Sequence, residues 1–159
     1  MSQPDARFLL SHPAHFIALG FGSGLARKAP GTFGTLAAFP LFWVLQQSSL
    51  SVQIVLVVAA VMLGIWACNL TGLHLNQHDS GHIVWDEIAA FLLVLIFTPV
   101  GPWWMLYAFA LFRLFDIFKP FPIGWADATV KGGIGVMLDD LLAAGYALCI
   151  LFITRHMLS

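Results

Sequence analysis

Two pairs of adjacent acidic residues precede apolar stretches of this sequence. Asp86 and Glu87 stand in "HDSGHIVWDEIAAF", and Asp139 and Asp140 stand in "KGGIGVMLDDLLAAG". Adjacent carboxylates repel each other, so a site that gathers both pairs needs a cation to stabilise it. A donor set made of oxygens, without Cys or His, favours Mg²⁺ or Ca²⁺ over zinc. The acid pairs therefore predict a site for a hard divalent metal.

A purely structural interpretation of the acid pairs is also open. Acids in the first turn of a helix interact favourably with the helix macrodipole, by about 0.3–1 kcal/mol each. However, a charge at membrane depth costs about 2.5–3.5 kcal/mol even on the most lenient insertion scale. Four of the eight acidic residues of the chain occur as adjacent pairs beside apolar segments. This placement favours a functional role for them.

Positive charge lies close to the acids in the sequence. In "FRLFDIFKPFP", Arg113, Asp116 and Lys119 follow one another at intervals of three residues, so they share one face of a helix. They could form ion pairs with i,i+3 spacing, but the two cations also supply what an anionic substrate needs. Asp127 and Lys131 have i,i+4 spacing, which we interpret as an ordinary helix ion pair.

The stretch "ARKAPGTFGTLAAFP" combines glycines, hydroxyls and positive charge at the edge of an apolar segment. Proteins use such combinations to surround an oxyanion. The stretch contains no G-x-x-x-x-G-K-[ST] pattern, which excludes the common nucleotide-binding loop. We therefore expect a loop, with the backbone of Gly31 to Thr35 near a phosphate group.

The composition indicates that a lipid bilayer surrounds much of the chain. Apolar residues make up 60% of the 159 residues and charged residues 9%, against roughly 45–50% and 25% in soluble domains. The net charge of −1 gives no indication of nucleic-acid binding. The length fits a single domain over residues 1–159.

Long intervals without charged residues define the apolar segments. They predict helices at roughly 33–46, 50–68, 88–98, 103–118 and 141–154. If the segments alternate in direction, the connections that carry nearly every charge lie on one side, and the positive-inside rule makes that side cytoplasmic. A full crossing takes about 20 residues, so the shorter segments are half-embedded or buried against their neighbours. We expect an all-α, compact, membrane-embedded helical bundle of about five apolar helices, with the polar loops on one face.

Carboxylates, a hard metal and fixed cations on a membrane face predict phosphoryl chemistry on a lipid. A non-enzymatic alternative is a small membrane transport or scaffold subunit that uses the acidic cluster as an ion site. The sequence lacks D-x-D-x-[TV], which excludes phosphatases that depend on that aspartyl nucleophile.

Four blocks of the sequence, in order, resemble the phosphatidylglycerophosphatase A family of membrane enzymes. They are "GFGSGLARKAPGTFGTLAAFP", "HDSGHIVWDE", "FRLFDIFKPFPIGWAD" and "KGGIGVMLDDLLAAG", and the similarity covers nearly the whole chain. The resemblance implies a helical, Mg²⁺-dependent phosphatase of the bacterial inner membrane. Such an enzyme removes the terminal phosphate of phosphatidylglycerophosphate to give phosphatidylglycerol. Thr35 stands where the family often has Ser, which keeps the hydroxyl.

The residues and the resemblance together give a hypothesis for the site. The proposed Mg²⁺ ligands are Asp86, Glu87, Asp139 and Asp140. Asp116 completes the metal shell or orients the attacking water. The proposed contacts to phosphate and lipid headgroup are Lys28, Gly31, Thr32, Thr35, Arg113, Lys119 and Lys131. A water nucleophile is preferred, and an aspartyl-phosphate intermediate stays open.

Overall fold

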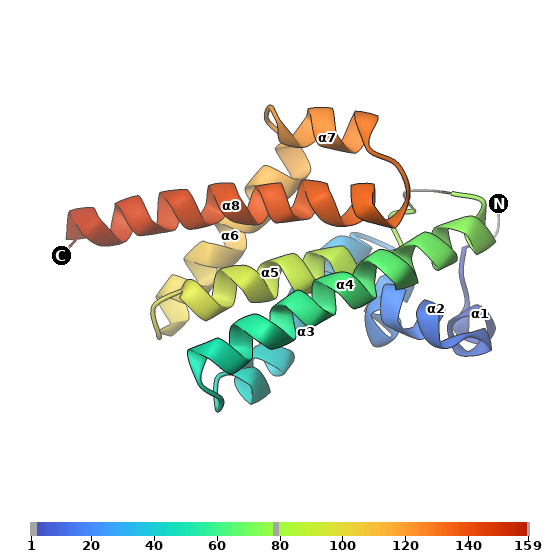
Figure 1. Cartoon of the computed structure of the whole chain (residues 1–159), viewed down its shortest axis with the longest axis horizontal. Helices are drawn as coiled ribbons and strands as arrows, with labels where there is room; N and C mark the ends of the chain where they lie inside the picture. Colours follow the sequence, from blue (N-terminus) through green and yellow to red (C-terminus); the bar gives the residue numbers. More distant parts are fainter. Residues whose placement is uncertain (1–2, 78–79, 159) are drawn as a thin grey trace.

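The computed structural model describes residues 3–77 and 80–158, and this part of the chain contains helices and connections but no β-strand. His78 and Asp79 of the second sequence block lie outside the described residues. In chain order the elements are α1 (Ala6–Ser11), α2 (Pro13–Ala18), the 3₁₀ helix η1 (Gly20–Leu25), α3 (Pro30–Leu45), α4 (Leu50–Leu75), α5 (Trp85–Phe97), α6 (Pro102–Phe118), α7 (Ile123–Thr129) and α8 (Gly132–Leu158). The all-α expectation is thus confirmed for the described residues (Figure 1).

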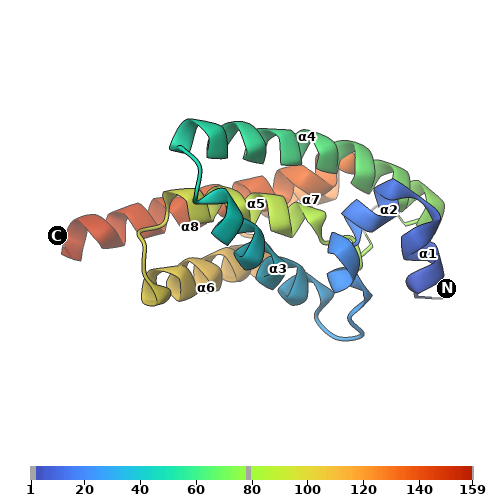
Figure 2. The same ribbon diagram turned by 90° about the horizontal axis from the view of Figure 1, so that it is seen from below.

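Helix α5 is the central element of the bundle. It packs against α3, α4, α6 and α8, and Figure 2 shows α4 on one side of it with α3 and α6 on the other. Nine of its thirteen residues are buried. A helix that is apolar all round is one that other helices enclose. The short segment predicted at 88–98 is therefore buried against its neighbours.

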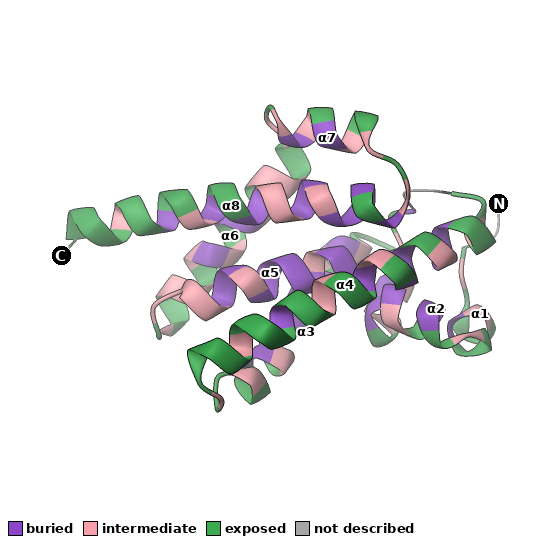
Figure 3. Ribbon diagram, in the orientation of Figure 1, coloured by how far each residue is buried: buried purple, intermediate pink, exposed green. Residues whose placement is uncertain are grey.

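Helices α4 and α8 are long and apolar enough to cross a membrane. With 26 and 27 residues, each is about 40 Å long at 1.5 Å per residue. Large apolar side chains are exposed along both helices, among them Val55 and Met62 on α4 and Phe152 and Ile153 on α8. Figure 3 shows many exposed positions along the ribbons of both helices. Such faces are suited to contact with lipid or with another protein. The embedding of all five apolar helices stays a prediction.

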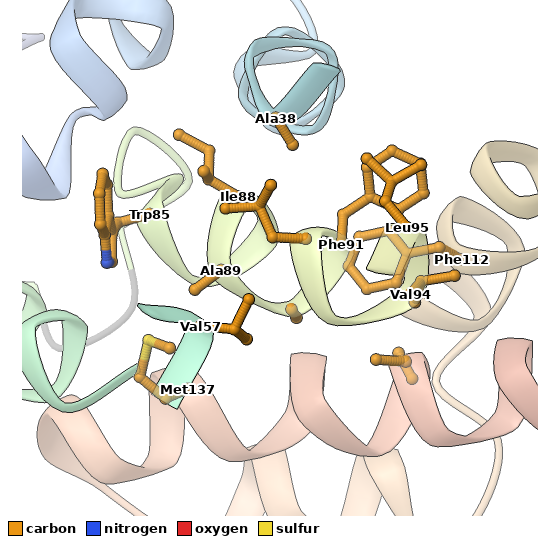
Figure 4. Packing of buried hydrophobic residues seen from close by; sticks show 14 of the residues in the cluster. Ala38, Val57, Trp85, Ile88, Ala89, Phe91, Val94, Leu95, Phe112 and Met137 are labelled. Carbon is orange, nitrogen blue, oxygen red and sulfur yellow. The ribbon is translucent and has the colours of Figure 1, made fainter. Parts of the chain in front are cut away.

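The core beneath the polar end joins three helices through aromatic rings. Phe91 of α5 lies 5.4 Å from Phe39 of α3 and 5.8 Å from Phe109 of α6, measured between ring centroids. Phe91 also contacts Phe112 at 5.5 Å, and both are completely buried (Figure 4). This packing fixes α3 and α6 relative to α5, whose first turn carries the first acid pair.

The predicted helix boundaries are correct at two breaks and wrong elsewhere. Helix α3 begins at Pro30 and not at 33, α4 continues to Leu75 beyond the predicted 68, and α5 begins at Trp85 and not at 88. Residues 46–49 and 98–101 separate helices as expected. Helix α8, however, begins at Gly132, so Asp139 and Asp140 lie about two turns inside it and are not at its start. An interaction with the helix macrodipole therefore does not explain this pair. Only Asp86 and Glu87 lie where such an interaction is possible, in the first turn of α5.

Helix α8 begins earlier in the sequence than predicted, in a glycine-rich stretch. These glycines allow α8 to approach α4 closely. A Cβ added at Gly133 would lie 1.9 Å from the carbonyl oxygen of Ile65 on α4. Small residues at such positions let helix backbones meet in membrane proteins. This contact sets the position of the second acid pair, which follows on the same helix.

The sequence analysis missed the short helices α1, α2, η1 and α7. Helix α7 folds back over α8 (Figure 1), and the Tyr146 hydroxyl donates a hydrogen bond of 2.9 Å to the Phe121 carbonyl. Helix α2 packs against α4, where the buried His15 is hydrogen-bonded to Thr71 at 2.9 Å. Helices of six or seven residues are too short for a hydrophobic period to reveal them.

We predict that Gly133→Ala destabilises the protein although alanine is the better helix former. The added methyl group meets the backbone of Ile65, and overpacking of this kind costs about 1–3 kcal/mol. Gly145→Ala is the matched control on the same helix, because a Cβ there meets no atom within 4 Å. Thermal unfolding in detergent should give a lower midpoint for Gly133→Ala alone. Equal midpoints for the two variants would contradict the close contact.

Candidate active site

The two acid pairs meet at one end of the bundle, where α5 begins and the first two turns of α8 lie. Asp86, Asp139 and Asp140 are almost fully buried, with 8%, 6% and 3% of their surface exposed. Burial of a carboxylate is costly unless hydrogen bonds or opposite charges compensate for it. The partners of these acids therefore define the site.

Arg113 of α6 is the first of two cations in the site. Its Nη1 atom donates to Glu87 Oε1 at 3.1 Å and forms a short ion pair with Asp116. The same atom lies 3.4 Å from the hydroxyl of Thr35 on α3. One guanidinium thus joins α3, α5 and α6. The predicted Arg113–Asp116 pair is confirmed.

Lys119 is the second cation. It follows α6 directly in the left-handed conformation, with φ of 43°. Its ammonium donates to Asp139 Oδ2 at 2.6 Å and contacts Asp127 Oδ1 at 3.0 Å. Burial lowers the pKa of Lys119, but the hydrogen bonds and charges of Asp139 and then Asp127 raise this pKa above its usual value overall. The ammonium links α6 to both α7 and α8.

Asp127 is the site residue that the sequence analysis missed. Its expected partner was Lys131, but α7 ends at Thr129, so the two do not share a helix, and Asp127 pairs with Lys119 instead. Lys28 and Lys131 are exposed, and neither forms an ion pair within the described residues. The structure therefore places these two lysines outside the ion-pair network.

The glycine-rich stretch is the start of α3 and not a loop. Pro30 occupies the first turn, where its fixed φ suits a helix. A Cβ at Gly31 would lie 1.9 Å from Glu87 Oε1, and one at Gly34 would lie 3.0 Å from Glu87 Oε2. Gly31 thus makes room for the Glu87 carboxylate, and Gly34 makes room for Val84 and the same carboxylate.

The hydroxyls of this stretch differ in their surroundings. Thr35 is completely buried, and its hydroxyl donates a hydrogen bond of 2.9 Å to the carbonyl oxygen of Gly31. The same hydroxyl lies next to Arg113. Thr32 is half-buried. Thr35 is therefore the hydroxyl that the structure joins to the charged network.

Negative charge is in excess in the site. Six carboxylates, those of Asp86, Glu87, Asp116, Asp127, Asp139 and Asp140, surround the two cations Arg113 and Lys119. Burial, and then repulsion from Asp116, raises the pKa of Glu87 to about 8, although Arg113 opposes this change. Burial, and then the charges of Glu87 and Asp139, also raises the pKa of Asp86 well above its usual range. An added cation would relieve this repulsion.

Oxygen atoms of the acids are left for such a cation. Asp86 Oδ1, Glu87 Oε2 and Asp140 Oδ2 are buried and accept no hydrogen bond from the described part of the chain. Hard carboxylate oxygens are suitable ligands for Mg²⁺ or Ca²⁺. Among residues 3–77 and 80–158, no group of three or more acid, imidazole or thiol side chains is arranged closely enough to hold a metal ion. The donor chemistry fits a hard cation, although the described arrangement is not a finished coordination shell.

Comparison with known proteins identifies the family. The family model described as phosphatidylglycerophosphatase A matches residues 16–155. The chain belongs to the phosphatidylglycerophosphatase A family. The resemblance seen in the four sequence blocks is thereby confirmed, and the match includes every residue of the predicted site.

Relatives of known name are similar over nearly their full length. Phosphatidylglycerophosphatase A of Haemophilus influenzae is 44% identical over 158 residues, which cover 98% of this chain and 96% of the relative. Phosphatidylglycerophosphatase A of Escherichia coli is 37% identical over 152 residues, with 95% and 88% covered. A Bacteroides thetaiotaomicron protein, named with a qualifier as a phosphatidylinositol-3-phosphatase, is 37% identical over 147 residues, with 87% and 91% covered. No solved structure matches the chain.

We predict that Gly31→Ala destabilises the protein by displacing Glu87 from Arg113. Alanine in a helix is otherwise favoured over glycine by about 0.5–1 kcal/mol, so a loss of stability would reveal the clash with Oε1. The control is the same change in a Glu87→Ala background, where the clashing carboxylate is absent. Thermal unfolding should show a loss in the first background and none in the second. A loss of equal size in both would rule out this contact as the cause.

Proposed function

We propose that this protein hydrolyses the terminal phosphate of phosphatidylglycerophosphate, giving phosphatidylglycerol and inorganic phosphate. The observation that carries the proposal is the paired arrangement of Arg113 and Lys119 with buried acids, in a chain of this family. Cations that are fixed in place beside acids suit a reaction in which charge develops on phosphoryl oxygens. The two relatives from Haemophilus and Escherichia carry the name of this activity.

We propose Mg²⁺ as the metal, with ligands from Asp86, Glu87, Asp139 and Asp140. The buried oxygens of Asp86, Glu87 and Asp140 that accept no hydrogen bond from the described part of the chain, and the excess of negative charge, support this assignment. When bound, Mg²⁺ would supply positive charge to the phosphoryl group and make water a better nucleophile.

The side chains of the chain itself have distinct proposed tasks. Arg113 binds the phosphate through guanidinium N–H groups, while Glu87 and Asp116 hold the guanidinium in place. Lys119 adds a second positive charge. Asp116 orients the attacking water, whose oxygen forms a bond to phosphorus as the bond from phosphorus to the glycerol oxygen breaks. The proton released by the water balances the charge of the leaving alkoxide.

We propose that the polar end of the bundle faces the cytoplasm in a bacterial inner membrane. Helices α4 and α8 would cross the bilayer, and the other apolar helices would be embedded beside them. Lys28 and Lys131 are exposed in the polar connections, where cations attract anionic lipid headgroups. Their proposed role is therefore to hold the lipid at the surface. The helical start of α3, with Gly31, Thr32 and Thr35, would contribute hydrogen bonds to the phosphate.

We predict that the purified protein releases phosphate from phosphatidylglycerophosphate in detergent when Mg²⁺ is present. Chelation of the metal should abolish release, and added Mg²⁺ should restore it, because the acids alone repel an anionic substrate. Phosphatidylinositol-3-phosphate serves as the comparison substrate, since one relative is named for a phosphatase that acts on this lipid. If neither lipid released phosphate, the result would favour the non-enzymatic alternative with an ion site. If the rates of release were equal with and without chelator, the result would exclude a role for the metal.

We predict that Glu87→Gln and Asp139→Asn each lower kcat by at least about 100-fold, because each removes charge that organises the metal and a cation. Both changes keep the size of the side chain. Asp5→Asn is the matched control, since Asp5 caps α1 and asparagine caps helices equally well. Turnover at saturating substrate, with unfolding midpoints as a check on folding, measures the effect. Full rates in both variants would disprove the metal assignment.

A further inference from the structure

Helix α7 contributes a single charged side chain to the site, and that side chain faces Lys119. Asp127 Oδ1 lies 3.0 Å from the Lys119 ammonium, which also contacts Asp139 Oδ2 at 2.6 Å. The two acids come from different helices and have different surroundings. Asp139 is buried beside Asp86 and Asp140, whereas the Asp127 side chain is 36% exposed.

The backbone of α7 is fixed on the same lysine. A Cβ at Gly124 would lie 2.8 Å from the carbonyl oxygen of Lys119, so only glycine permits this approach. Ile123 and Ala126 are completely buried where α7 packs on α8. Helix α7 therefore contacts Lys119 at both its backbone and its ammonium, and α8 holds α7 in place.

A cation bound by Asp139 would compete with Lys119 for the same carboxylate. Two positive charges at one carboxylate repel each other, and a lysine ammonium is a mobile charge on a flexible four-carbon chain. Without a second anchor, the displaced ammonium would turn to solvent. Asp127 is the second anchor that the structure provides, and it lies outside the proposed metal ligands.

We propose that Asp127 is a positioning residue that keeps the Lys119 ammonium at the phosphate site when Asp139 binds the metal. The proposal rests on the proposed function, because it assigns Lys119 a role in binding substrate phosphate. Asp127 acts through Lys119 and touches neither the metal nor the reacting atoms. A purely structural role of Asp127 in docking α7 through Lys119 would lower the unfolding midpoint and leave KM unchanged, which makes the two roles separable.

The kinetic test uses the full chain in detergent with phosphatidylglycerophosphate and Mg²⁺. Asp127→Asn should raise KM by about threefold to tenfold and change kcat by less than about twofold, since it weakens one partly exposed ion pair used in binding. Asp127→Glu should restore most of the loss. In a Lys119→Met background, Asp127→Asn should have no further effect on KM, and Asp5→Asn should change neither parameter. An unchanged KM in Asp127→Asn, or an equal effect with and without Lys119, would overturn the proposal.

An unfolding test decides the contact without measuring activity. Thermal unfolding of wild type, Asp127→Asn, Lys119→Met and the double variant forms a double-mutant cycle. The cycle should show coupling with chelator and also at saturating Mg²⁺, because Asp127 retains the lysine in both states. Additive effects, or coupling that disappears with Mg²⁺, would overturn the proposal. If wild type released no phosphate, the proposed function would fail, whereas this cycle would still decide whether Asp127 holds Lys119.

Discussion

The ion pairs of Arg113 with Glu87 and Asp116 are the contacts on which the arrangement of the site depends. A single guanidinium at the end of α6 neutralises acids of two helices and reaches the buried hydroxyl of Thr35 on a third. Breaking a buried pair by removing one partner costs about 3–5 kcal/mol, because the remaining charge stays buried. The absence of a side chain at Gly31 leaves room for the Glu87 carboxylate that this guanidinium holds.

The site itself is a poor source of stability, and the apolar core beneath it compensates. Six acids and two cations at the end of a bundle repel one another on balance. Below them, the rings of Phe39, Phe91 and Phe109 join α3, α5 and α6. Close contacts such as that of Gly133 with Ile65 hold α4 and α8 together. This division of roles is expected where function requires charges that folding disfavours.

The sequence predicted the apolar helices well because charged residues are almost absent from them. It also grouped the acid pairs with Arg113 and Lys119 correctly, since each lies at the end of an apolar interval or next to one. The helical starts of α3 and α8 were missed because glycines weaken a helix unless a neighbour needs the space, and those neighbours, Glu87 and Ile65, are distant in the sequence. The predicted partner of Asp127 was wrong for a similar reason. Local spacing favoured Lys131, whereas the packing of α7 on α8 places Asp127 next to Lys119. Ligand geometry and membrane depth depend on tertiary packing, which no local pattern encodes.

The central position of α5 has a consequence for how the protein is made. Helices α3 and α4 are synthesised before α5, and α6 and α8 after it, yet all four enclose it. Asp86 and Glu87 therefore leave the ribosome well before Arg113, and the nascent chain must accommodate their charges without that partner. Asp139 and Asp140 arrive last, with α8. The acid cluster is thus completed only when the final helix docks, and biogenesis itself delays assembly of the site until the bundle has closed.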